Sequence, residues 1–264
     1  MRAILFDKDG TLLDFERTWT PLLNRVALEI AKGDETMAGT LLDAGGLDPA
    51  TGKFRSGSVI GAGTTDLIVR LWYPKLKGAA FSAKVEKMDR VFAAHGGAHS
   101  APIDGAAVAL DLLAARGFVM GVATNDATIA ARAALTATGM IRNLPHVFGY
   151  DSVPEPKPAA DMVFAFCEAA RVAPPDVVVV GDNTHDLVMA RNAGAALAIG
   201  VTSGNSAATD LAPLADAVLG SIRDLPATGP ASWFWRPLLL STRRAGRLSW
   251  PASPYLPKRK LPKP

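Results

Sequence analysis

Five short apolar segments alternate with helical stretches along most of the chain, and this alternation limits the possible folds more than any other feature of the sequence. The segments span residues 3–6, 118–123, 147–150, 177–180 and 196–201. Strands that alternate with helices are typical of a parallel sheet whose faces are covered by those helices. The sequence therefore predicts an α/β fold built on a parallel sheet.

Capping residues, glycine and proline mark the helices between the later strands. They predict a helix over residues 106–115 with Asp104 as its cap and Gly117 as its stop, one from Asp126 to near Gly139, one that begins at Pro158, and one that follows the acidic loop at Asp182 and ends near Gly194. A helix between successive strands is the usual crossover of a parallel sheet.

The first and second predicted strands are separated by roughly a hundred residues, which is far more than one crossover connection needs. Apolar residues recur there at helical spacing, in Leu22, Leu23, Val26, Ala27 and Ile30 and again in Leu67, Ile68, Leu71 and Trp72. We expect a helical cap over residues 15–99, inserted after the first strand. The catalytic core would then consist of residues 1–14 and 100–228.

His95 and His99 have the spacing of a metal-binding pair on a helix. Gly96 and Gly97 lie between them, however, and no acidic residue accompanies them. We expect loop residues at the exit of the cap, where the two glycines suit a hinge that lets the cap close.

Residues 229–264 differ from the rest of the chain. They hold seven prolines, eight of the 28 basic residues and none of the 25 acidic ones, so the formal net charge of +3 comes from this tail. We expect the tail to lie outside the core fold. Contact with a membrane surface, with nucleic acid or with another subunit is the alternative, because basic residues interleaved with tryptophan in the cluster 233–235 suit the first two.

The composition indicates a globular protein with no membrane-spanning segment, since 49% of the residues are apolar, 20% are charged, and no apolar stretch is long enough. Asp7 and Asp9 interrupt the first apolar segment early, which argues against a signal peptide and for a cytoplasmic protein. Cys167 is the only cysteine. It excludes an intrachain disulfide and a cysteine-based zinc site, and we expect it in the core of a helix.

Two carboxylates follow the first predicted strand at once, in Asp7-Lys8-Asp9-Gly10-Thr11. Acidic side chains this close together repel each other unless a cation compensates their charge. This pattern favours a divalent metal ion at the end of the strand.

Three later stretches also place polar side chains just past a predicted strand, where parallel sheets bind ligands. They are Thr124-Asn125, Lys157, and Asp182 with Asp186. Each has a structural explanation when it is taken alone: a hydroxyl at a helix cap, a solvated lysine, or acids in a turn. Their occurrence together and in this order indicates a single site.

In that order the four stretches resemble the motifs of the haloacid dehalogenase-like (HAD) phosphohydrolase superfamily, over residues 1 to about 225. The resemblance implies a Rossmann-like core of three layers with a helical cap inserted after the first motif. It also implies Mg²⁺-dependent phosphoryl transfer through an aspartyl phosphate.

The residue types fit this chemistry. Asp7 would be the nucleophile, and Asp9 would protonate the leaving alkoxide and later deprotonate the hydrolytic water. Thr124 and the backbone amide of Asn125 would donate to the phosphoryl oxygens, and Lys157 would add a positive charge beside them.

The metal ligands follow from the same resemblance. Asp7 and Asp182 would hold Mg²⁺ together with the backbone carbonyl of Asp9. Asp186 would bind it directly or through a water molecule, and His185 would be a bystander in the same loop.

Asp9 favours phosphate-ester cleavage, because the acid-dehalogenating branch of the family has no second acid at this position. With its helical cap, the sequence most resembles phosphoglycolate phosphatases. Arg55, in the glycine-flanked loop 52–58, is a candidate ligand for a substrate carboxylate, and a solvated pair with Lys53 is the alternative.

We therefore expect a Mg²⁺-dependent monophosphatase of a small phosphorylated metabolite, with 2-phosphoglycolate as the first candidate and no nucleic acid as a partner. Sugar phosphates, nucleotides or pyrophosphate are alternative substrates. A non-catalytic protein that docks through its basic tail is an alternative of another class.

Overall fold

A computed structural model of the chain describes residues 3–228, and the predicted tail at 229–264 lies outside the described residues. The core is a six-stranded sheet in the order β5-β4-β1-β6-β7-β8, and every neighbouring pair is parallel. The strands are β1 (Ala3–Phe6), β4 (Val119–Ala123), β5 (His146–Phe148), β6 (Val177–Gly181), β7 (Leu197–Val201) and β8 (Ala217–Leu219).

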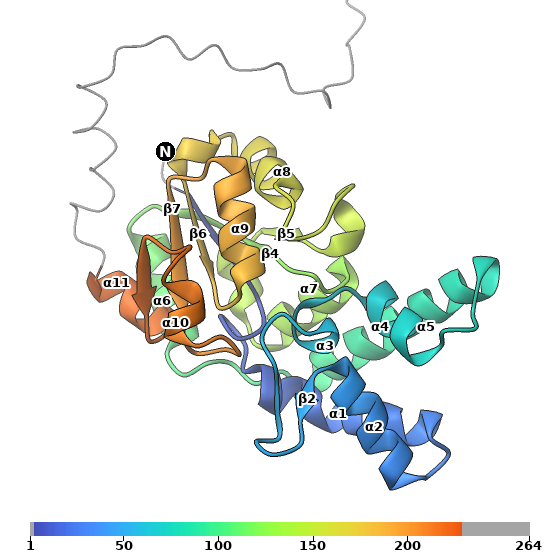
Figure 1. Cartoon of the computed structure of the whole chain (residues 1–264). Coiled ribbons are helices and arrows are strands. Elements are labelled where there is room, and N and C mark those ends of the chain that lie inside the picture. The colour runs from blue at the N-terminus through green and yellow to red at the C-terminus, as the bar shows by residue number, and fades with distance from the viewer. Residues whose placement is uncertain (1–2, 229–264) are drawn as a thin grey trace, which may run out of the picture. The chain divides into compact units, whose positions relative to one another are not determined.

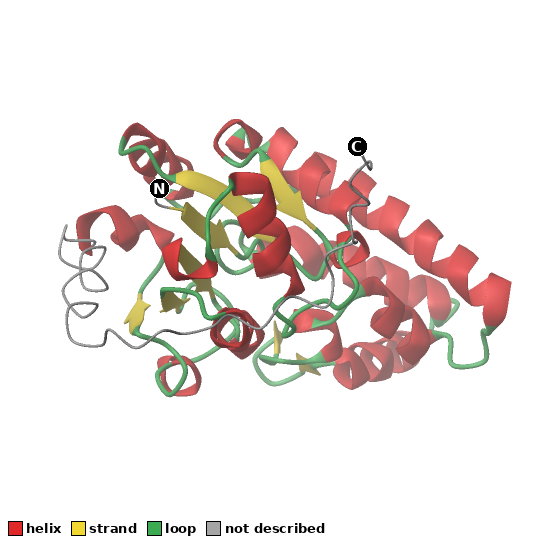
Figure 2. Ribbon diagram, turned by 90° about the horizontal axis from the view of Figure 1, so that it is seen from above, coloured by secondary structure: helices red, strands yellow, loops and turns green. Residues whose placement is uncertain are grey.

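Helices cover both faces of this sheet, which gives three layers (Figures 1 and 2). One face carries α8 (Asp161–Ala170), α9 (Thr184–Ala193) and α10 (Ala208–Leu211), and the other carries α6 (Ala106–Ala115), α7 (Thr128–Ala137) and α11 (Leu225–Thr228). Short 3₁₀ helices span Met140–Asn143, Tyr150–Ser152, Pro174–Asp176 and Ile222–Asp224. The predicted Rossmann-like α/β architecture is confirmed.

The central strands are apolar because both of their faces are buried. All four residues of β1 and all five of β6 are buried, and Val177–Val180 forms an uninterrupted β-branched run. Such continuous runs are typical of parallel strands between two helical layers. Cys167 is buried on α8, where it packs with Val163 and Phe166 as a small apolar residue.

The order of the strands places a functional crevice. The chain builds β1, β4 and β5 in one direction and then returns to the other side of β1 with β6, β7 and β8. Parallel sheets bind ligands at the carboxyl ends of strands where the order reverses in this way. The ends of β1 and β6 are therefore the expected place for a site.

The segment between β1 and β4 forms helices α1 (Phe15–Ile30), α2 (Glu35–Gly45), α3 (Val59–Ala62), α4 (Thr65–Trp72) and α5 (Gly78–His99), with a short hairpin of β2 (Leu47–Asp48) and β3 (Lys53–Phe54). These helices form a body beside the sheet in Figure 1. They share an apolar core that includes Trp19, Leu22, Val69 and Phe92. The predicted helical spacing is confirmed in α1 and α4.

The expectation of loop residues at positions 95–99 is wrong, and the hinge expected there stays a prediction. Helix α5 continues to His99, and its end packs along the core helix α7. A β-carbon on Gly96 would lie 3.5 Å from the Cβ of Ala134, and one on Gly97 would lie 3.7 Å from the Cβ of Ala133. The two glycines therefore leave room for close packing between two helices.

The predicted span of α6 is confirmed, but two predicted helix caps, Asp104 and Asp126, and the predicted helix start at Pro158 are wrong. Helix α6 begins after Gly105, whose positive φ of 80° makes the turn, so Asp104 does not cap it. Asp126 does not cap α7, because its carboxylate forms an ion pair with Lys8. Helix α8 begins only at Asp161, since the backbone around Pro158 forms a turn in which Ala159 N donates to Pro156 O (2.9 Å).

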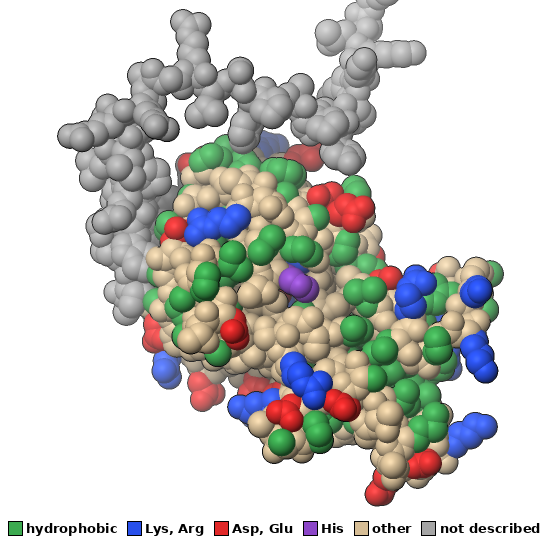
Figure 3. Space-filling model, in the orientation of Figure 1, with side chains coloured by type: hydrophobic (Ala, Val, Ile, Leu, Met, Phe, Trp, Pro, Cys, Tyr) green, Lys and Arg blue, Asp and Glu red, His purple; other side chains and the backbone are tan. Residues whose placement is uncertain are grey.

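On the face drawn in Figure 3, the Lys, Arg, Asp and Glu side chains form small separate groups, many of them at the rim. On that face the described residues form no continuous basic patch. Of the helices in the described part of the chain, none is long and apolar enough to cross a membrane.

Candidate active site

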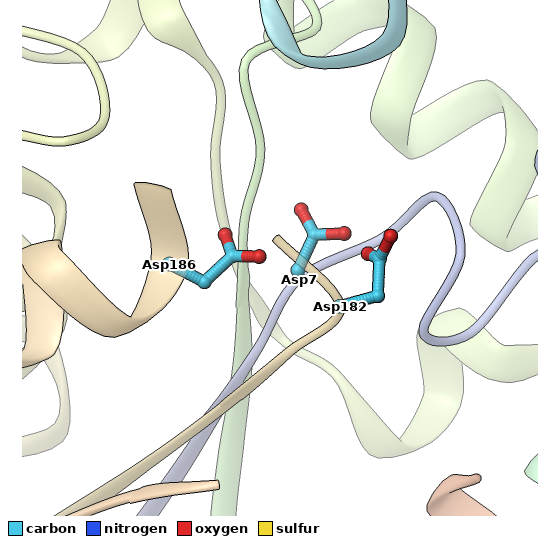
Figure 4. A group of neighbouring side chains, drawn as sticks. All are labelled: Asp7, Asp182 and Asp186. Atoms are coloured by element: carbon cyan, nitrogen blue, oxygen red, sulfur yellow. The ribbon is translucent and has the colours of Figure 1, made fainter. Parts of the chain in front are cut away.

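Three buried carboxylates converge at the carboxyl ends of β1 and β6. Asp7 follows β1, Asp182 follows β6, and Asp186 lies in the first turn of α9, and their side chains face a common space (Figure 4). One oxygen from each lies within 4.8 Å of the others. The sequence separates these residues by up to 179 positions, so only the parallel sheet brings them together.

Asp182 is held by its surroundings on both oxygens. Oδ2 accepts a hydrogen bond from Asn205 N (3.1 Å), and Oδ1 accepts one from the Thr11 hydroxyl (3.4 Å). The backbone of Gly10 and that of Gly204 approach its carboxylate so closely that a β-carbon on either would overlap it. The loop 203–205 after β7 was not predicted as part of the site.

Asp186 has two structural partners besides its place in the acidic cluster. Its Oδ2 accepts from Asn183 N (3.0 Å), which forms a capping box at the start of α9. Its Oδ1 accepts from Lys157 Nζ (2.6 Å). The helix cap thus fixes the position of this carboxylate.

Lys157 joins Asp186 to Asp7, because its ammonium group also lies 2.5 Å from Asp7 Oδ1. The side chain is buried, and although burial lowers the pKa of Lys157, the carboxylates of Asp186 and Asp7 outweigh this effect and raise it above its usual range. Lys157 is therefore a cation at every physiological pH. The single positive charge of Lys157 does not balance the negative charge of three neighbouring carboxylates.

That excess of negative charge fits a divalent metal ion. Burial raises the pKa of Asp7 to about 6, although Lys157 opposes the rise, and burial with repulsion from Asp7 and Asp186 raises the pKa of Asp182 well above its usual value. A hard cation removes such a penalty, and carboxylate oxygens are the ligands that Mg²⁺ prefers. The donor set of Asp7, Asp182 and Asp186 suits this ion.

Asp9 lies next to this cluster but is held from another direction. Its Oδ1 accepts from the indole nitrogen of Trp19 (2.6 Å), and its Oδ2 is paired with Lys8 Nζ. Burial raises the pKa of Asp9 to about 6, against the attraction of Lys8. The side chain of Asp9 is thus outside the group of three carboxylates that the structure brings within metal-binding distance.

Thr124 and Asn125 border the same space from the end of β4. The Thr124 hydroxyl accepts from Asp126 N (3.1 Å). Asn125 Oδ1 accepts from Lys157 N (3.1 Å), and its Nδ2 donates to the carbonyl of Ala62 on the cap (2.8 Å). Asn125 therefore connects the loop of Lys157 with the cap.

A pocket opens at this point between the cap and the core. Its walls are Asp7, Asp9, Phe15, Ile60, Gly61, Ala62, Gly63, Thr124, Asn125, Asp126, Lys157, Asp182, Asn183, His185 and Asp186. Helix α3, with Phe15 of α1, supplies the cap side of the pocket, and no sequence pattern predicted α3. His185, expected to be a bystander, is one of the lining residues, and burial lowers its pKa.

Arg55 does not line this pocket. Its guanidinium group is half-exposed and lies 2.7 Å from Asp43 Oδ1 on the cap. Among residues 3–228, Lys157 is the only lysine or arginine in the pocket wall.

The sequence is similar to those of known proteins. Residues 1–194 match the family model of the haloacid dehalogenase-like hydrolases. The chain is 32% identical over 194 residues to a phosphoglycolate phosphatase of Xylella fastidiosa, which covers 73% of this chain and 77% of that protein. It is 26% identical over 198 residues to a phosphoglycolate phosphatase of Thiobacillus denitrificans, covering 74% of this chain and 80% of that protein.

Solved structures share the fold. A predicted phosphoglycolate phosphatase from Haemophilus somnus has a TM-score of 0.66 at 21% identity, and the match covers 85% of this chain and 96% of that one. CbbY from Rhodobacter sphaeroides in complex with phosphate has a TM-score of 0.62 at 22% identity, with 85% and 96% covered.

Proposed function

The chain belongs to the haloacid dehalogenase-like hydrolase family and is a phosphatase, and on this premise we propose that it hydrolyses a small phosphate monoester with Mg²⁺ through an aspartyl phosphate on Asp7. The observation that carries the proposal is the convergence of three buried carboxylates and Lys157 at the ends of β1 and β6. The relatives favour this enzyme over a protein that only binds.

Asp7 would attack the phosphorus atom of the ester. The bond between phosphorus and the ester oxygen breaks as the new bond to the Asp7 oxygen forms, and Lys157 offsets the charge of the phosphoryl group. Thr124 and the backbone amide of Asn125 would donate hydrogen bonds to the phosphoryl oxygens. A nucleophile that is an anion needs no base to activate it.

Asp9 would act twice. It donates a proton to the departing alkoxide in the first step, and in the second step it accepts a proton from the water that attacks the aspartyl phosphate. Inorganic phosphate leaves, and the Asp7 carboxylate is regenerated. The raised pKa of Asp9, about 6, suits a group that must both give and take a proton.

Asp7 and Asp182 would hold the Mg²⁺, with the backbone carbonyl of Asp9, and Asp186 would bind it directly or through water. The ion would supply positive charge against which an anionic nucleophile and an anionic substrate can approach each other. Asp186 also keeps Lys157 in place through their ion pair.

2-Phosphoglycolate is the first substrate to test, because several relatives are named for its hydrolysis. Arg55 as a ligand for the substrate carboxylate remains a hypothesis that requires the side chain to leave Asp43. With Arg55→Ala, a loss of kcat/KM for 2-phosphoglycolate but not for ethyl phosphate would support that role. If Arg55→Ala changed kcat/KM by the same factor for both esters, or left both unchanged, that role would be excluded.

The proposal is tested by a panel of 2-phosphoglycolate, sugar phosphates, nucleotides and pyrophosphate, assayed with Mg²⁺ and with a chelator. Wild type should turn over one or more of these compounds only with Mg²⁺, and Asp7→Asn should lose at least about a thousandfold in kcat. The proposal would be contradicted if Asp7→Asn kept the kcat of wild type, or if wild type kept its full turnover in chelator.

A further inference from the structure

Both oxygens of the Asp9 carboxylate are held by side chains that have no part in the chemistry described above. Lys8 pairs with Oδ2 and Trp19 donates to Oδ1, the latter across 2.6 Å. A carboxylate that hydrogen-bonds through both oxygens cannot rotate freely. Its direction is set by these two partners.

Lys8 is an unusual residue at this place, because its side chain is fully buried. Its ammonium group lies between two carboxylates, that of Asp9 and that of Asp126 (2.9 Å). A buried lysine is stable only when it is paired in this way. Lys8 is therefore fixed, and it fixes Asp9 in turn.

Trp19 approaches from helix α1 of the cap and is itself immobilised. Its ring packs edge-on against Phe92, with centroids 5.7 Å apart, and the ammonium group of Lys8 lies 5.0 Å from its centre. The side chain is 5% exposed. A rigid indole N–H at hydrogen-bonding distance defines both the distance and the direction of its acceptor.

We propose that Lys8 and Trp19 are positioning residues that hold the Asp9 carboxylate toward the leaving group. The inference rests on the acid and base role proposed for Asp9. Because Trp19 belongs to α1, the orientation of the proton donor depends on the seating of a cap helix. The side chain of neither residue touches the phosphoryl group or the nucleophile in this scheme.

A positioning role predicts a specific kinetic signature. A strongly basic leaving group such as ethoxide needs a proton donor, whereas 4-nitrophenolate leaves without one. A misplaced acid should therefore slow the reaction of ethyl phosphate much more than that of 4-nitrophenyl phosphate. The measurement is kcat/KM for ethyl phosphate and for 4-nitrophenyl phosphate, because kcat/KM reports formation of the aspartyl phosphate and not its hydrolysis.

Trp19→Phe keeps an aromatic ring in the cap core and removes the N–H. We expect its kcat/KM to fall about 10- to 100-fold for ethyl phosphate and less than about threefold for 4-nitrophenyl phosphate. The matched control is Trp72→Phe, because Trp72 is 4% exposed in the same core and donates its N–H to Leu41 O (3.1 Å), away from Asp9. The control should leave the ratio of the two kcat/KM values unchanged.

Lys8→Met leaves the partly buried carboxylates of Asp9 and Asp126 without their cation and is at risk of misfolding, so it is paired with Asp126→Asn, which restores the charge balance. The double variant should show the same selective loss for ethyl phosphate. When Trp19→Phe is added to this double variant, kcat/KM for ethyl phosphate should fall by a smaller factor than when it is added to wild type, since both changes act through the Asp9 carboxylate.

Asp9→Asn separates failure of this inference from failure of the proposed function. If Asp9→Asn lowers kcat/KM for ethyl phosphate selectively while Trp19→Phe lowers kcat/KM equally for both substrates or for neither, the acid role stands and the positioning role is overturned. If Asp9→Asn lowers kcat/KM by the same factor for ethyl phosphate and 4-nitrophenyl phosphate, the acid role fails and the inference fails with it. The inference is supported if Asp9→Asn and Trp19→Phe both lower kcat/KM selectively for ethyl phosphate, while Trp72→Phe leaves the ratio of the two kcat/KM values unchanged.

Discussion

Gly204 lies against the carboxylate of Asp182, so close that a β-carbon on Gly204 would overlap it. Gly204→Ala should therefore displace Asp182 from the acidic cluster without removing any charge. Asp182 is a proposed Mg²⁺ ligand, and changes around a metal ligand typically cost 10- to 100-fold in affinity, so we expect about that loss in the Mg²⁺ concentration dependence of turnover. Gly39→Ala on α2, where a β-carbon meets no atom within 4 Å, is the control. An unchanged Mg²⁺ dependence in Gly204→Ala would contradict the close approach.

Asp182 should destabilise the fold when the metal is absent. Its raised pKa means that the folded state disfavours the ionised carboxylate, so at pH 7 the folded protein bears a penalty that the unfolded chain does not. In chelator, Asp182→Asn should unfold at a higher temperature than wild type. Mg²⁺ should raise the midpoint of wild type and leave that of the variant nearly unchanged, because only an ion that binds the folded state stabilises it. A lower midpoint for the variant in chelator would refute this.

Asn125 should couple cap and core to substrate binding. Its side chain donates to Ala62 O (2.8 Å) and accepts from Lys157 N (3.1 Å). With each hydrogen bond contributing about 1 kcal/mol, Asn125→Ala should lower kcat/KM roughly tenfold, mainly through KM. Ser56→Ala is the control, because Ser56 joins the cap to Ser206 of the core (2.6 Å) outside the pocket wall. Equal effects of the two changes would show that Asn125 acts only as a cap contact.

His95 should make stability depend on pH. Burial lowers its pKa from 6.5, so as the pH falls below 6.5 the unfolded chain takes up a proton first and unfolding becomes easier. This contribution is intact above pH 6.5 and is lost as the pH falls through the lowered pKa of the folded state. Urea unfolding at pH 7.5 and 5.5 should show a smaller loss in His95→Gln than in wild type, and comparing the two cancels all other groups. A parallel loss would exclude His95 as the source.

Gly97→Ala distinguishes a helix from a hinge. In a helix the alanine should raise the free energy of unfolding by about 0.5–1 kcal/mol and leave turnover unchanged, since the new methyl group meets Ala133 at an ordinary 3.7 Å. At a hinge the same change would restrict motion and lower kcat. Thermal unfolding and kcat measured on one preparation decide between them.

The strands that position the site were predictable because burial on both faces makes them continuous apolar runs. The edge strand β8 was missed, since its three residues are only half-buried and carry no such run. Capping predictions failed where a side chain had a stronger partner elsewhere: Asp126 pairs with the buried Lys8, a contact that no local pattern reveals.

The same distinction holds within the site. Asp7, Lys157, Asp182 and Asp186 come together because each lies past the carboxyl end of a strand in one parallel sheet, and the sequence predicted these strands. Trp19, Gly204 and the α3 segment reach the site only through tertiary packing. Their residue types carry no chemical signature, so the sequence offered no reason to select them.

The close contact of α5 with α7 has a consequence for engineering specificity. Exchanging caps between relatives is an obvious way to change the substrate of such an enzyme, but here the end of the cap is shaped to one helix of the core through Gly96 and Gly97. A chimaera that imports a foreign cap onto this core would meet a mismatched surface at α7. Successful grafts should therefore carry α7 along with the cap, as one transplantable module.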